Sequence, residues 1–535
     1  MWKRNMNKIK TISLYFVLAL ILSYTYFNNP IDKRNYEFAT FEAVSEALAI
    51  GPIVAEHAGI SPLEKGYGLG YYHENTGDTT SYWTDTLSLY EGDTGYLTNK
   101  DFQDGYALSG KQLAFSANLY TRNTYTPGNE FLFWDGSRVC ITAVKEQDFV
   151  LYVSVDTQKK LTREANGSLS DIRVFDAEGR ELSRGIFSEY PSQIGLQGRI
   201  FRKLARIFPY GSAVTWLHLL TAIAMSLVVV SISWQLYKKY GWLMAAVFFA
   251  VFWLSPWIVQ FARNLYWVEF TWFLPMLFGL WCSNYINNRK RIFIGSVGVF
   301  LSVFLKSACG YEYITTVMLG AILFLLADLG MALLVEKDRE KFRRVFACLF
   351  MVGIAALLGF MLAIVIHASI RGEGNITEGI RSIYMNNFKE RAWGGDPSAF
   401  PESERASLEA SVFEVLQKYF QIDTHLIVGV SGKLFSILIG VSFLLPVCIL
   451  CYKRKNQKGF RMEAEEVFLL LSAFMTSISW FVLGKAHSFI HTHLNFVMWY
   501  FGFIQLLFYV PVRSSIDLGK VLVKKWKNKE VIRGR

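Results

Sequence analysis

Apolar residues are not spread evenly along this chain but are gathered into long runs with few charges. Ten such runs have about the length that a helix needs to cross a hydrocarbon core of about 30 Å. The ten predicted spans are residues 11–27, 213–236, 242–261, 267–284, 292–309, 313–335, 345–368, 434–452, 466–484 and 494–512. The pattern predicts a polytopic α-helical membrane protein with about ten transmembrane helices.

The composition supports this prediction. Of the 535 residues, 52% are hydrophobic and only 19% are charged, whereas soluble domains carry about 45–50% apolar and about 25% charged residues. This balance excludes a soluble enzyme, a fibrous protein and a disordered chain. The net charge of +11 does not indicate nucleic acid as a partner, because the excess lies in short loops between spans, where positive charge fixes orientation.

The loops divide into two classes by charge. Alternate loops, the N-terminus and the C-terminal tail together hold 27 Lys and Arg residues, whereas the three short loops of the other class hold only Arg263, Lys306 and Lys485. Positive loops stay in the cytoplasm, so both termini are predicted to be cytoplasmic. The first span follows four basic residues and lacks a cleavage site of small residues, and we expect it to remain as an anchor in the cell (inner) membrane.

This topology divides the chain into six parts. They are the N-terminus with the first span (1–27), an extracytoplasmic domain (28–212), spans 2–7 (213–368), a second extracytoplasmic loop (369–433), spans 8–10 (434–512) and a basic cytoplasmic tail (513–535). Within the first outer domain, the sequence favours a helix over 36–58, a β-rich part over about 130–185 and an amphipathic helix over about 194–208. The domain is therefore predicted to be α/β, and its last, basic helix to lie at the membrane surface.

Ionisable residues gather in the three short outer turns, where each is a functional hypothesis because charge is costly near the bilayer. They are Arg263 and Glu269, which flank the loop between spans 3 and 4, then Lys306 with Tyr311 and Glu312 between spans 5 and 6, and Lys485, His487, His491 and His493 between spans 9 and 10. Convergence of these turns would create a site for an anionic headgroup. For Arg263 and Lys306, snorkelling of the cation to the interface is the alternative.

Aromatic residues beside the same turns are expected to form the interfacial belt of a membrane protein. They are Tyr266, Trp267, Tyr311, Tyr313, Trp499 and Tyr500.

The spacing of His487 and His491, four residues apart, is also used by zinc sites. No Glu follows His487 as it does in metalloproteases, and no carboxylate lies nearby in sequence. We therefore expect these histidines to bind phosphate or to transfer protons, assign no metal ligands and expect no cofactor. A divalent metal stays open as an alternative.

Acidic candidates follow the first span. Glu37 and Glu42 lie close enough to its outer end for a carboxylate to reach a site at the membrane face and act as a general base. Glu42 is preferred because it lies between Phe41 and Ala43, in a more apolar setting. A solvated helix position is the ordinary alternative for both.

The order of these features resembles that of the C-type membrane glycosyltransferases, with one span, a long outer loop that opens with acidic residues, and an amphipathic helix that leads into many spans. Tyr190-Pro191-Ser192-Gln193-Ile194-Gly195-Leu196-Gln197-Gly198 stands where that family has its return helix. The chain is also similar to poorly characterised bacterial surface-polysaccharide membrane proteins, in segments such as Gly310-Tyr311-Glu312-Tyr313 and Lys485-Ala486-His487-Ser488.

This resemblance implies inverting transfer of a sugar from a polyprenyl-phosphate carrier to an extracytoplasmic glycan or lipid-linked acceptor. Glu42 or Glu37 would be the base. The donor phosphate would be bound by Arg263, Lys306, Lys485, His487 and His491, with Glu312, Tyr311 and His493 in support. The implied partners are the lipid bilayer, the carrier-linked sugar and the acceptor.

Two other functions remain open. An oligosaccharide or O-antigen-type polymerase or ligase also has many spans and outer arginines, and Arg371, Arg381 and Arg391 in the second outer loop suit it. A non-enzymatic transporter is the other alternative. Transporters place polar groups at broken helices near the midplane, and these spans carry almost no charge there.

The topology is tested by single cysteines in a background without other thiols. A membrane-impermeant thiol reagent added to intact cells is expected to modify cysteines that replace Lys100 or Glu390, but not those that replace Gln457 or Lys525. Labelling at position 457 would contradict the orientation derived from the positive loops.

Overall fold

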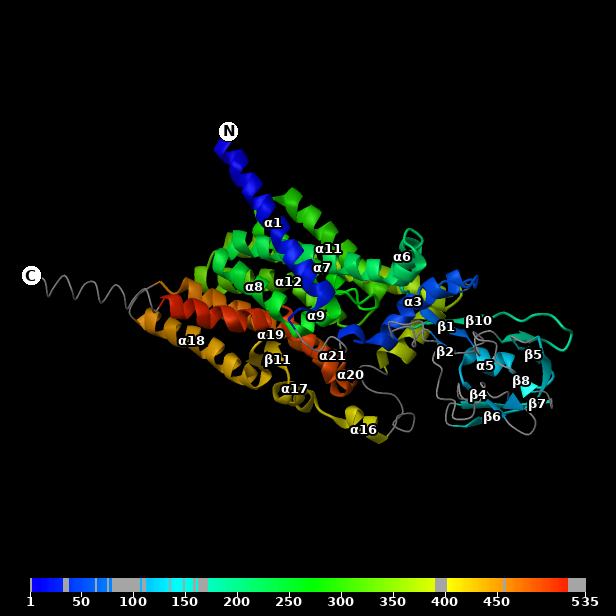
Figure 1. Ribbon diagram of the computed structural model, residues 1–535. Coiled ribbons are helices and arrows are strands. Elements are labelled where there is room, and N and C mark those ends of the chain that lie inside the picture. Colours follow the sequence, from blue (N-terminus) through cyan, green and yellow to red (C-terminus); the bar gives the residue numbers. More distant parts are fainter. Residues whose placement is uncertain are drawn as a thin grey trace, which may run out of the picture. The chain divides into compact units, whose positions relative to one another are not determined.

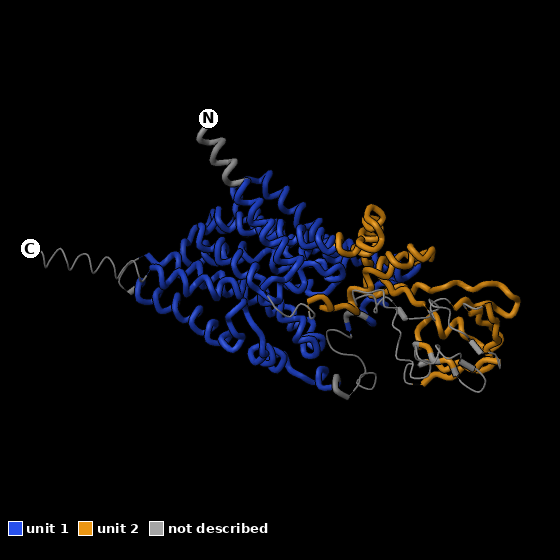
Figure 2. The backbone as a smooth tube through the Cα atoms, in the orientation of Figure 1, with its two compact units in different colours: residues 1–35, 218–535 blue, residues 36–217 orange. Residues whose placement is uncertain are grey.

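The computed structural model describes residues 2–31, 38–62, 65–74, 77–78, 106–107, 112–133, 136–147, 150–156, 160–161, 172–389, 402–455 and 459–517. The chain forms two compact units, which are residues 1–35 with 218–535 (unit 1) and residues 36–217 (unit 2) (Figure 2). Unit 1 is largely helical, whereas unit 2 combines helices with antiparallel sheets (Figure 1). The four labelling positions lie outside the described residues.

The helices of unit 1 follow the apolar runs of the sequence. They are α1 (Trp2–Asn28), α7 (Tyr210–Tyr240, which begins in unit 2), α8 (Trp242–Leu254), α9 (Pro256–Ala262), α10 (Phe270–Asn284), α11 (Arg289–Cys309), α12 (Ile314–Gly330) with η3 (Met331–Glu336), α13 (Arg339–Arg371), α14 (Ile376–Ile383), η4 (Tyr384–Lys389), α16 (Glu402–Glu409), α17 (Val412–Gln421), η6 (Gly432–Leu434), α18 (Phe435–Lys455), α19 (Arg461–Leu483), α20 (Lys485–Ile490), α21 (Thr492–Asn495), η7 (Phe496–Tyr500) and Phe503–Asp517. One hairpin, β11 (His425–Ile427) and β12 (Val430–Ser431), interrupts them.

Six helices among the described residues are long and apolar enough to cross a membrane, and two bent pairs raise this number to eight. Even the shortest of the six, α11, has 21 residues, which at about 1.5 Å per residue matches a hydrocarbon core of about 30 Å. The predicted spans 11–27 and 267–284 correspond to shorter apolar helices, Ser13–Asn28 and the 15-residue α10. The chain thus has the helices of a polytopic membrane protein, while the number of ten spans stays a prediction.

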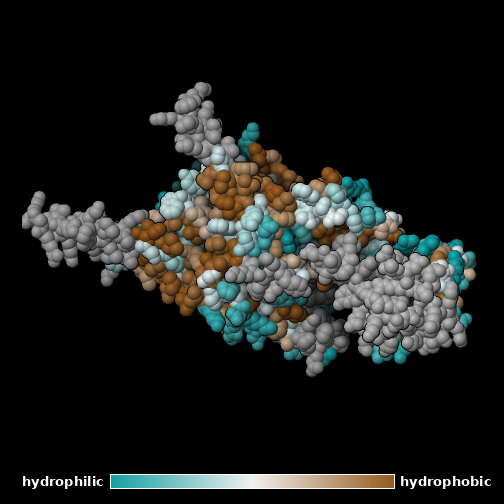
Figure 3. Space-filling view, in the orientation of Figure 1, coloured by the Kyte–Doolittle hydropathy of each residue, from teal (hydrophilic) through white to brown (hydrophobic). Residues whose placement is uncertain are grey.

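The outer surface of these helices is apolar. Leu357 on α13 is 52% exposed and Leu444 on α18 is 65% exposed, and Figure 3 shows a broad hydrophobic surface over the helices of unit 1. A patch of this size is not left in water by a soluble protein, so these faces are suited to lipid.

The pair α8–α9 bends by 67° at Ser255. Pro256 opens α9, and a proline disfavours the helical conformation for the residue before it. Ser255 is accordingly extended, and its hydroxyl caps α9 by accepting a hydrogen bond from the N–H of Ile258 at 3.3 Å. The predicted span 242–261 is therefore a broken helix.

The second bend, of 49°, separates Thr492–Tyr500 from Phe503–Asp517. Gly502 lies at this point with φ 90°, in the left-handed region that only glycine enters at little cost. The predicted span 494–512 is thus also broken.

Hydrogen bonds from the protein satisfy a carbonyl at each break, and one of them comes from the hairpin β11–β12. The N–H of Val428 donates to the carbonyl of Leu254 at 2.9 Å, and the hydroxyl of Tyr500 donates to the carbonyl of Leu426. Gln505 adds a side-chain donor to the carbonyl of Tyr500 at 2.7 Å. Lipid supplies no hydrogen bonds, so irregular backbone at membrane depth is tolerated only where the protein itself provides them.

Ion pairs tie together residues in or beside the predicted cytoplasmic loops, with Asp328 and Glu466 lying within the adjoining predicted spans. The pairs are Lys239–Asp328 (2.9 Å), Arg461–Glu336, Lys453–Glu463 (2.6 Å) and Arg513–Glu466 (2.8 Å). Loops that the charge pattern assigns to one side are therefore linked to one another in the folded chain.

Unit 2 contains a five-stranded antiparallel sheet in the order β4-β7-β6-β5-β9 and a three-stranded sheet in the order β10-β1-β2. The strands are β1 (Gly70–Glu74), β2 (Gly77–Asp78), β3 (Tyr106–Ala107), β4 (Gln112–Ser116), β5 (Glu130–Leu132), β6 (Arg138–Gln147), β7 (Val150–Asp156), β8 (Lys160–Leu161), β9 (Arg173–Phe175) and β10 (Gly185–Glu189). The larger sheet and α5 (Leu119–Thr124) enclose a core that includes Phe115, Tyr125 and Phe131. The strands therefore begin well before the β-rich part expected over 130–185.

In unit 2, one helix packs beside the smaller sheet and a second helix packs against the first. The helix expected over 36–58 is α3 (Ala43–His57), and the amphipathic helix is α6 (Leu196–Ala205). Arg206 pairs with Glu56 at 2.6 Å to join the two. A Cβ on Gly68 would lie 2.0 Å from the carbonyl oxygen of Gly195. The segment before β1 therefore lies so close to the start of α6 that only glycine fits at position 68.

Gly502→Ala is expected to destabilise unit 1. Alanine at a left-handed position costs about 1–2 kcal/mol, and its Cβ would lie 3.3 Å from Cδ1 of Leu323. Gly440→Ala is the control, because a Cβ there meets nothing within 4 Å and alanine favours a helix by about 1 kcal/mol. The midpoint of thermal unfolding in detergent should fall for Gly502→Ala and hold or rise for Gly440→Ala, and equal midpoints would disprove the strain argument.

Candidate functional site

The three ionisable turns of unit 1 are joined by a chain of aromatic rings. Trp267, from the first turn, stacks on Tyr313, from the second, with ring centroids 5.7 Å apart. Tyr313 meets Trp480 edge-on at 5.5 Å. Trp480 in turn meets His487, from the third turn, at 6.2 Å. These four residues, called the aromatic line below, bring together turns that lie more than 200 residues apart in sequence.

Most of the expected belt aromatics are buried instead of facing the interface. The interpretation as a belt is wrong for Tyr266, Trp267, Tyr313, Trp499 and Tyr500, which are at most 8% exposed. Their rings pack against other aromatic rings inside unit 1, in the tilted, edge-on and stacked arrangements that aromatic pairs favour.

Backbone strain accompanies the aromatic line at two points. Val268, next to Trp267, has φ 39°, and Tyr313 itself has φ 64°. A β-branched residue at positive φ is an outlier, and such strain persists only where the surroundings over-determine it, which is typical of functional sites.

Lys306 does not snorkel to the surface. Its side chain is 2% exposed, and its Nζ donates to the carbonyl of Gly310 at 2.8 Å, at the end of α11. Glu312, two residues further on, is 5% exposed. The second turn therefore holds both a cation and a carboxylate away from water.

Arg263 connects two helix ends. It ends α9, and its Nη1 donates to the carbonyl of Phe27 near the end of α1 at 3.1 Å. A carbonyl at a helix C-terminus is a favourable place for a cation, so this contact gives Arg263 a structural role.

Tyr311 forms a pair with a residue that the sequence did not indicate. Its hydroxyl lies 3.0 Å from Nδ1 of His367 on α13, and the two rings stack. Burial, and then the charge of Glu312, raise the pKa of Tyr311, while Arg371 lowers it. The phenol therefore stays neutral at physiological pH and is a hydrogen-bond donor.

The third turn consists of α20 and α21 and is called the histidine turn below. The rings of His487 and His491 lie 4.5 Å apart, and that of His493, which is exposed, lies 5.5 Å from His491. The amide nitrogen of Asn495 contacts Nδ1 of His487 at 3.2 Å. Because an amide nitrogen only donates, Nδ1 accepts, and the imidazole proton lies on Nε2.

Helices α16 and α17, which belong to the predicted second outer loop, are attached to the histidine turn. Nζ of Lys485 donates to the carbonyl of Leu408 at 3.0 Å, and the hydroxyl of the buried Tyr419 donates to the carbonyl of Ser488 at 2.7 Å. Glu414 lies within electrostatic range of Lys485, and hydrogen bonds from Ser411 lower the pKa of its carboxyl. No carboxylate lies near the histidine turn in sequence, but the fold brings Glu414 of α17 close to it.

The candidate bases belong to the other unit. Glu42 is half-buried with a left-handed φ of 55°, and its carboxylate accepts a hydrogen bond from the hydroxyl of Ser45 at 2.8 Å. Glu46, one turn further along α3, is 3% exposed. Glu37 and Arg391 lie outside the described residues.

Glu269, which flanks the first turn together with Arg263 in the sequence, was assigned no role in the predicted site. It is fully buried, and neither of its carboxyl oxygens has a hydrogen-bond partner among the described residues. A buried, unbonded carboxylate is costly, so its presence beside Trp267 and Val268 is a further mark of a functional region. The signal was its place at the start of an otherwise uncharged predicted span.

Within the described residues, no three His, Cys, Asp or Glu side chains are grouped as metal ligands.

Comparisons of this chain with protein-family models, with curated proteins and with solved structures find no match. A functional assignment therefore depends on the geometry above and on the resemblance in the order of the elements.

Proposed function

We propose that this chain is an integral membrane glycosyltransferase, which moves a sugar from a polyprenyl-phosphate carrier to an extracytoplasmic glycan or lipid-linked acceptor. The observation that carries the proposal is the aromatic line, since it unites the three turns whose cations and histidines suit a phosphate headgroup. The apolar faces of α13 and α18 are suited to the lipid in which such a carrier resides.

Lys485, His487 and His491 are the proposed ligands of the donor phosphate. A cation makes charge-assisted hydrogen bonds to phosphate, and His487 carries its proton on Nε2, where it donates. Lys306 and Arg263 add positive charge in the neighbouring turns. Fixed donors of this kind stabilise the charge that develops on a leaving phosphate.

The proposed reaction is a single displacement. Glu42 takes the proton of the acceptor hydroxyl, whose oxygen bonds to the anomeric carbon. The bond from that carbon to the phosphate oxygen breaks, and the polyprenyl phosphate leaves with the electron pair. Attack opposite the leaving group inverts the anomeric carbon. Glu37 takes the role of the base if Glu42 does not.

The histidine turn is expected to bind phosphate without metal. Lys485→Ala and His487→Ala should each weaken binding of a polyprenyl-phosphate analogue about tenfold, because each removes a donor worth roughly 1–2 kcal/mol. EDTA should leave sugar transfer by the wild type unchanged. If EDTA abolishes transfer and zinc restores it, the phosphate interpretation of this turn is wrong.

Glu42→Gln keeps the size of the side chain but removes the basic oxygen. Transfer should fall by about 10²–10⁴-fold, while binding of the donor analogue is retained. Ser45→Ala is the control, since it removes the hydroxyl that donates to Glu42 and leaves the carboxylate in place. Wild-type turnover in Glu42→Gln would remove Glu42 from the mechanism.

An oligosaccharide polymerase or ligase is the second candidate. It is favoured by Arg371, whose Nε donates to Ser382 at 2.8 Å and whose charge acts on Tyr311, so that an arginine of the second outer loop lies near one of the three turns. Product length after incubation with a carrier-linked sugar separates the two, because a transferase adds one unit and a polymerase or ligase moves a block.

A further inference from the structure

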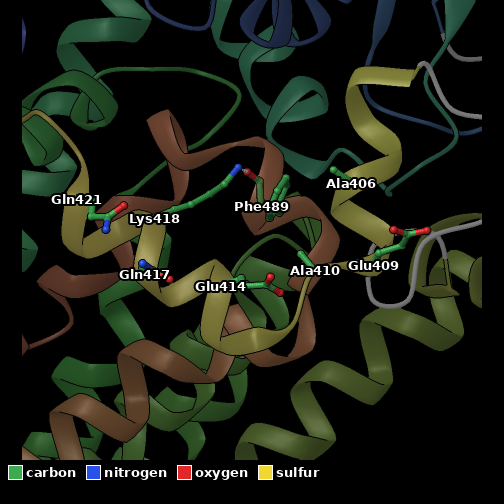
Figure 4. Close-up of a pocket in the computed structure, with 8 residues that line it drawn as sticks. All are labelled: Ala406, Glu409, Ala410, Glu414, Gln417, Lys418, Gln421 and Phe489. Carbon is green, nitrogen blue, oxygen red and sulfur yellow. Dashed lines mark hydrogen bonds between the residues drawn. The ribbon is translucent and has the colours of Figure 1, made fainter.

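A pocket of about 670 Å³ lies between α16, α17 and the histidine turn (Figure 4). One helix, α17, contributes Glu414, Gln417, Lys418 and Gln421. These positions are three and four residues apart and so lie on one helical face. The volume is within the range of about 300–1,000 Å³ that small-ligand sites occupy.

The walls of this pocket are fixed to the histidine turn. Tyr419 and Lys485 make the two side-chain-to-carbonyl bonds described above. Nζ of Lys418 makes a third, to the carbonyl of Phe489 at 3.3 Å, and lies 3.2 Å from the centroid of the Phe489 ring. Burial lowers the pKa of Lys418. The cavity is therefore held in shape by three hydrogen bonds to one turn.

Small side chains leave the space between the walls open. Ala406 and Ala410 line the α16 side, and Glu409 ends that helix. Larger apolar residues at these two positions would fill the pocket.

The lining suits a ligand with many hydroxyl groups. Carboxylates only accept hydrogen bonds, an ammonium only donates, and amides do both, whereas each sugar hydroxyl donates and accepts. Two carboxylates, Glu409 and Glu414, outnumber the single ammonium of Lys418, so a phosphate group is not favoured here. Neutral or amino sugars fit this charge, and phosphorylated ligands do not.

We propose that this pocket binds one or two sugar units of the acceptor glycan and holds them beside the histidine turn. The assignment to the acceptor depends on the proposed function, whereas the affinity for a neutral or amino sugar does not. Donor phosphate and acceptor sugar would then be bound on the two sides of one rigid turn.

The test uses the full chain in nanodiscs and saturation-transfer NMR with lipid-free, phosphate-free disaccharides in gluco, galacto, manno and amino-sugar forms. At least one disaccharide is expected to bind. The double variant Gln417→Ala/Gln421→Ala and the filling variant Ala406→Leu should each weaken its binding at least tenfold. Glu378→Gln, an exposed position outside the pocket, should bind as the wild type does.

Binding of a polyprenyl-phosphate analogue is measured in the same variants and should be unchanged. Absence of disaccharide binding, or binding that neither pocket variant weakens, would overturn the proposal. If disaccharides bind in the pocket but no polyprenyl-phosphate analogue binds at all, the pocket stands and the glycosyltransferase proposal fails. If the chain transfers sugar but the pocket variants leave the KM for the acceptor unchanged, the assignment of the pocket to the acceptor is wrong, while the glycosyltransferase proposal stands.

Discussion

Hydrogen bonding of the backbone within an apolar unit is the constraint on which this structure depends. Two helices of unit 1 break, one at Ser255 and one at Gly502, and each break releases peptide groups that lipid cannot satisfy. The N–H of Val428 donates to the carbonyl of Leu254 at the first break, and the side chain of Gln505 donates to the carbonyl of Tyr500 at the second. At both breaks the protein itself therefore satisfies a released carbonyl.

Several polar side chains at the three turns are hydrogen-bonded within the protein as well. Lys306 donates to a helix-end carbonyl, Arg263 does likewise, and Tyr311 pairs with His367. Glu269 is different, because its oxygens have no partner among the described residues. A region that retains a buried carboxylate without a hydrogen-bond partner, together with two residues of strained backbone, has the character of a site and not of a simple core.

Sequence patterns predicted the apolar helices well, because a run of about twenty apolar residues has few other solutions. They also selected the three turns that the aromatic line joins. They did not predict the breaks, because Pro256 and Gly502 each lie within an unbroken apolar run, nor the pairing of β1 with β10, whose partners lie more than 110 residues apart. Trp267 and Tyr313 were misinterpreted as belt residues, because aromatic rings near a span end look alike in sequence whether they face lipid or a neighbouring turn.

The hairpin that fills the first break is encoded far downstream. Trp257 at the start of α9 donates to Thr424, 167 residues later in the chain. During synthesis, α8 and α9 therefore enter the membrane long before the segment that completes them exists. An insertion factor or water must cover the open backbone until then, and a chain truncated before residue 424 would present that backbone to lipid and to quality-control proteases.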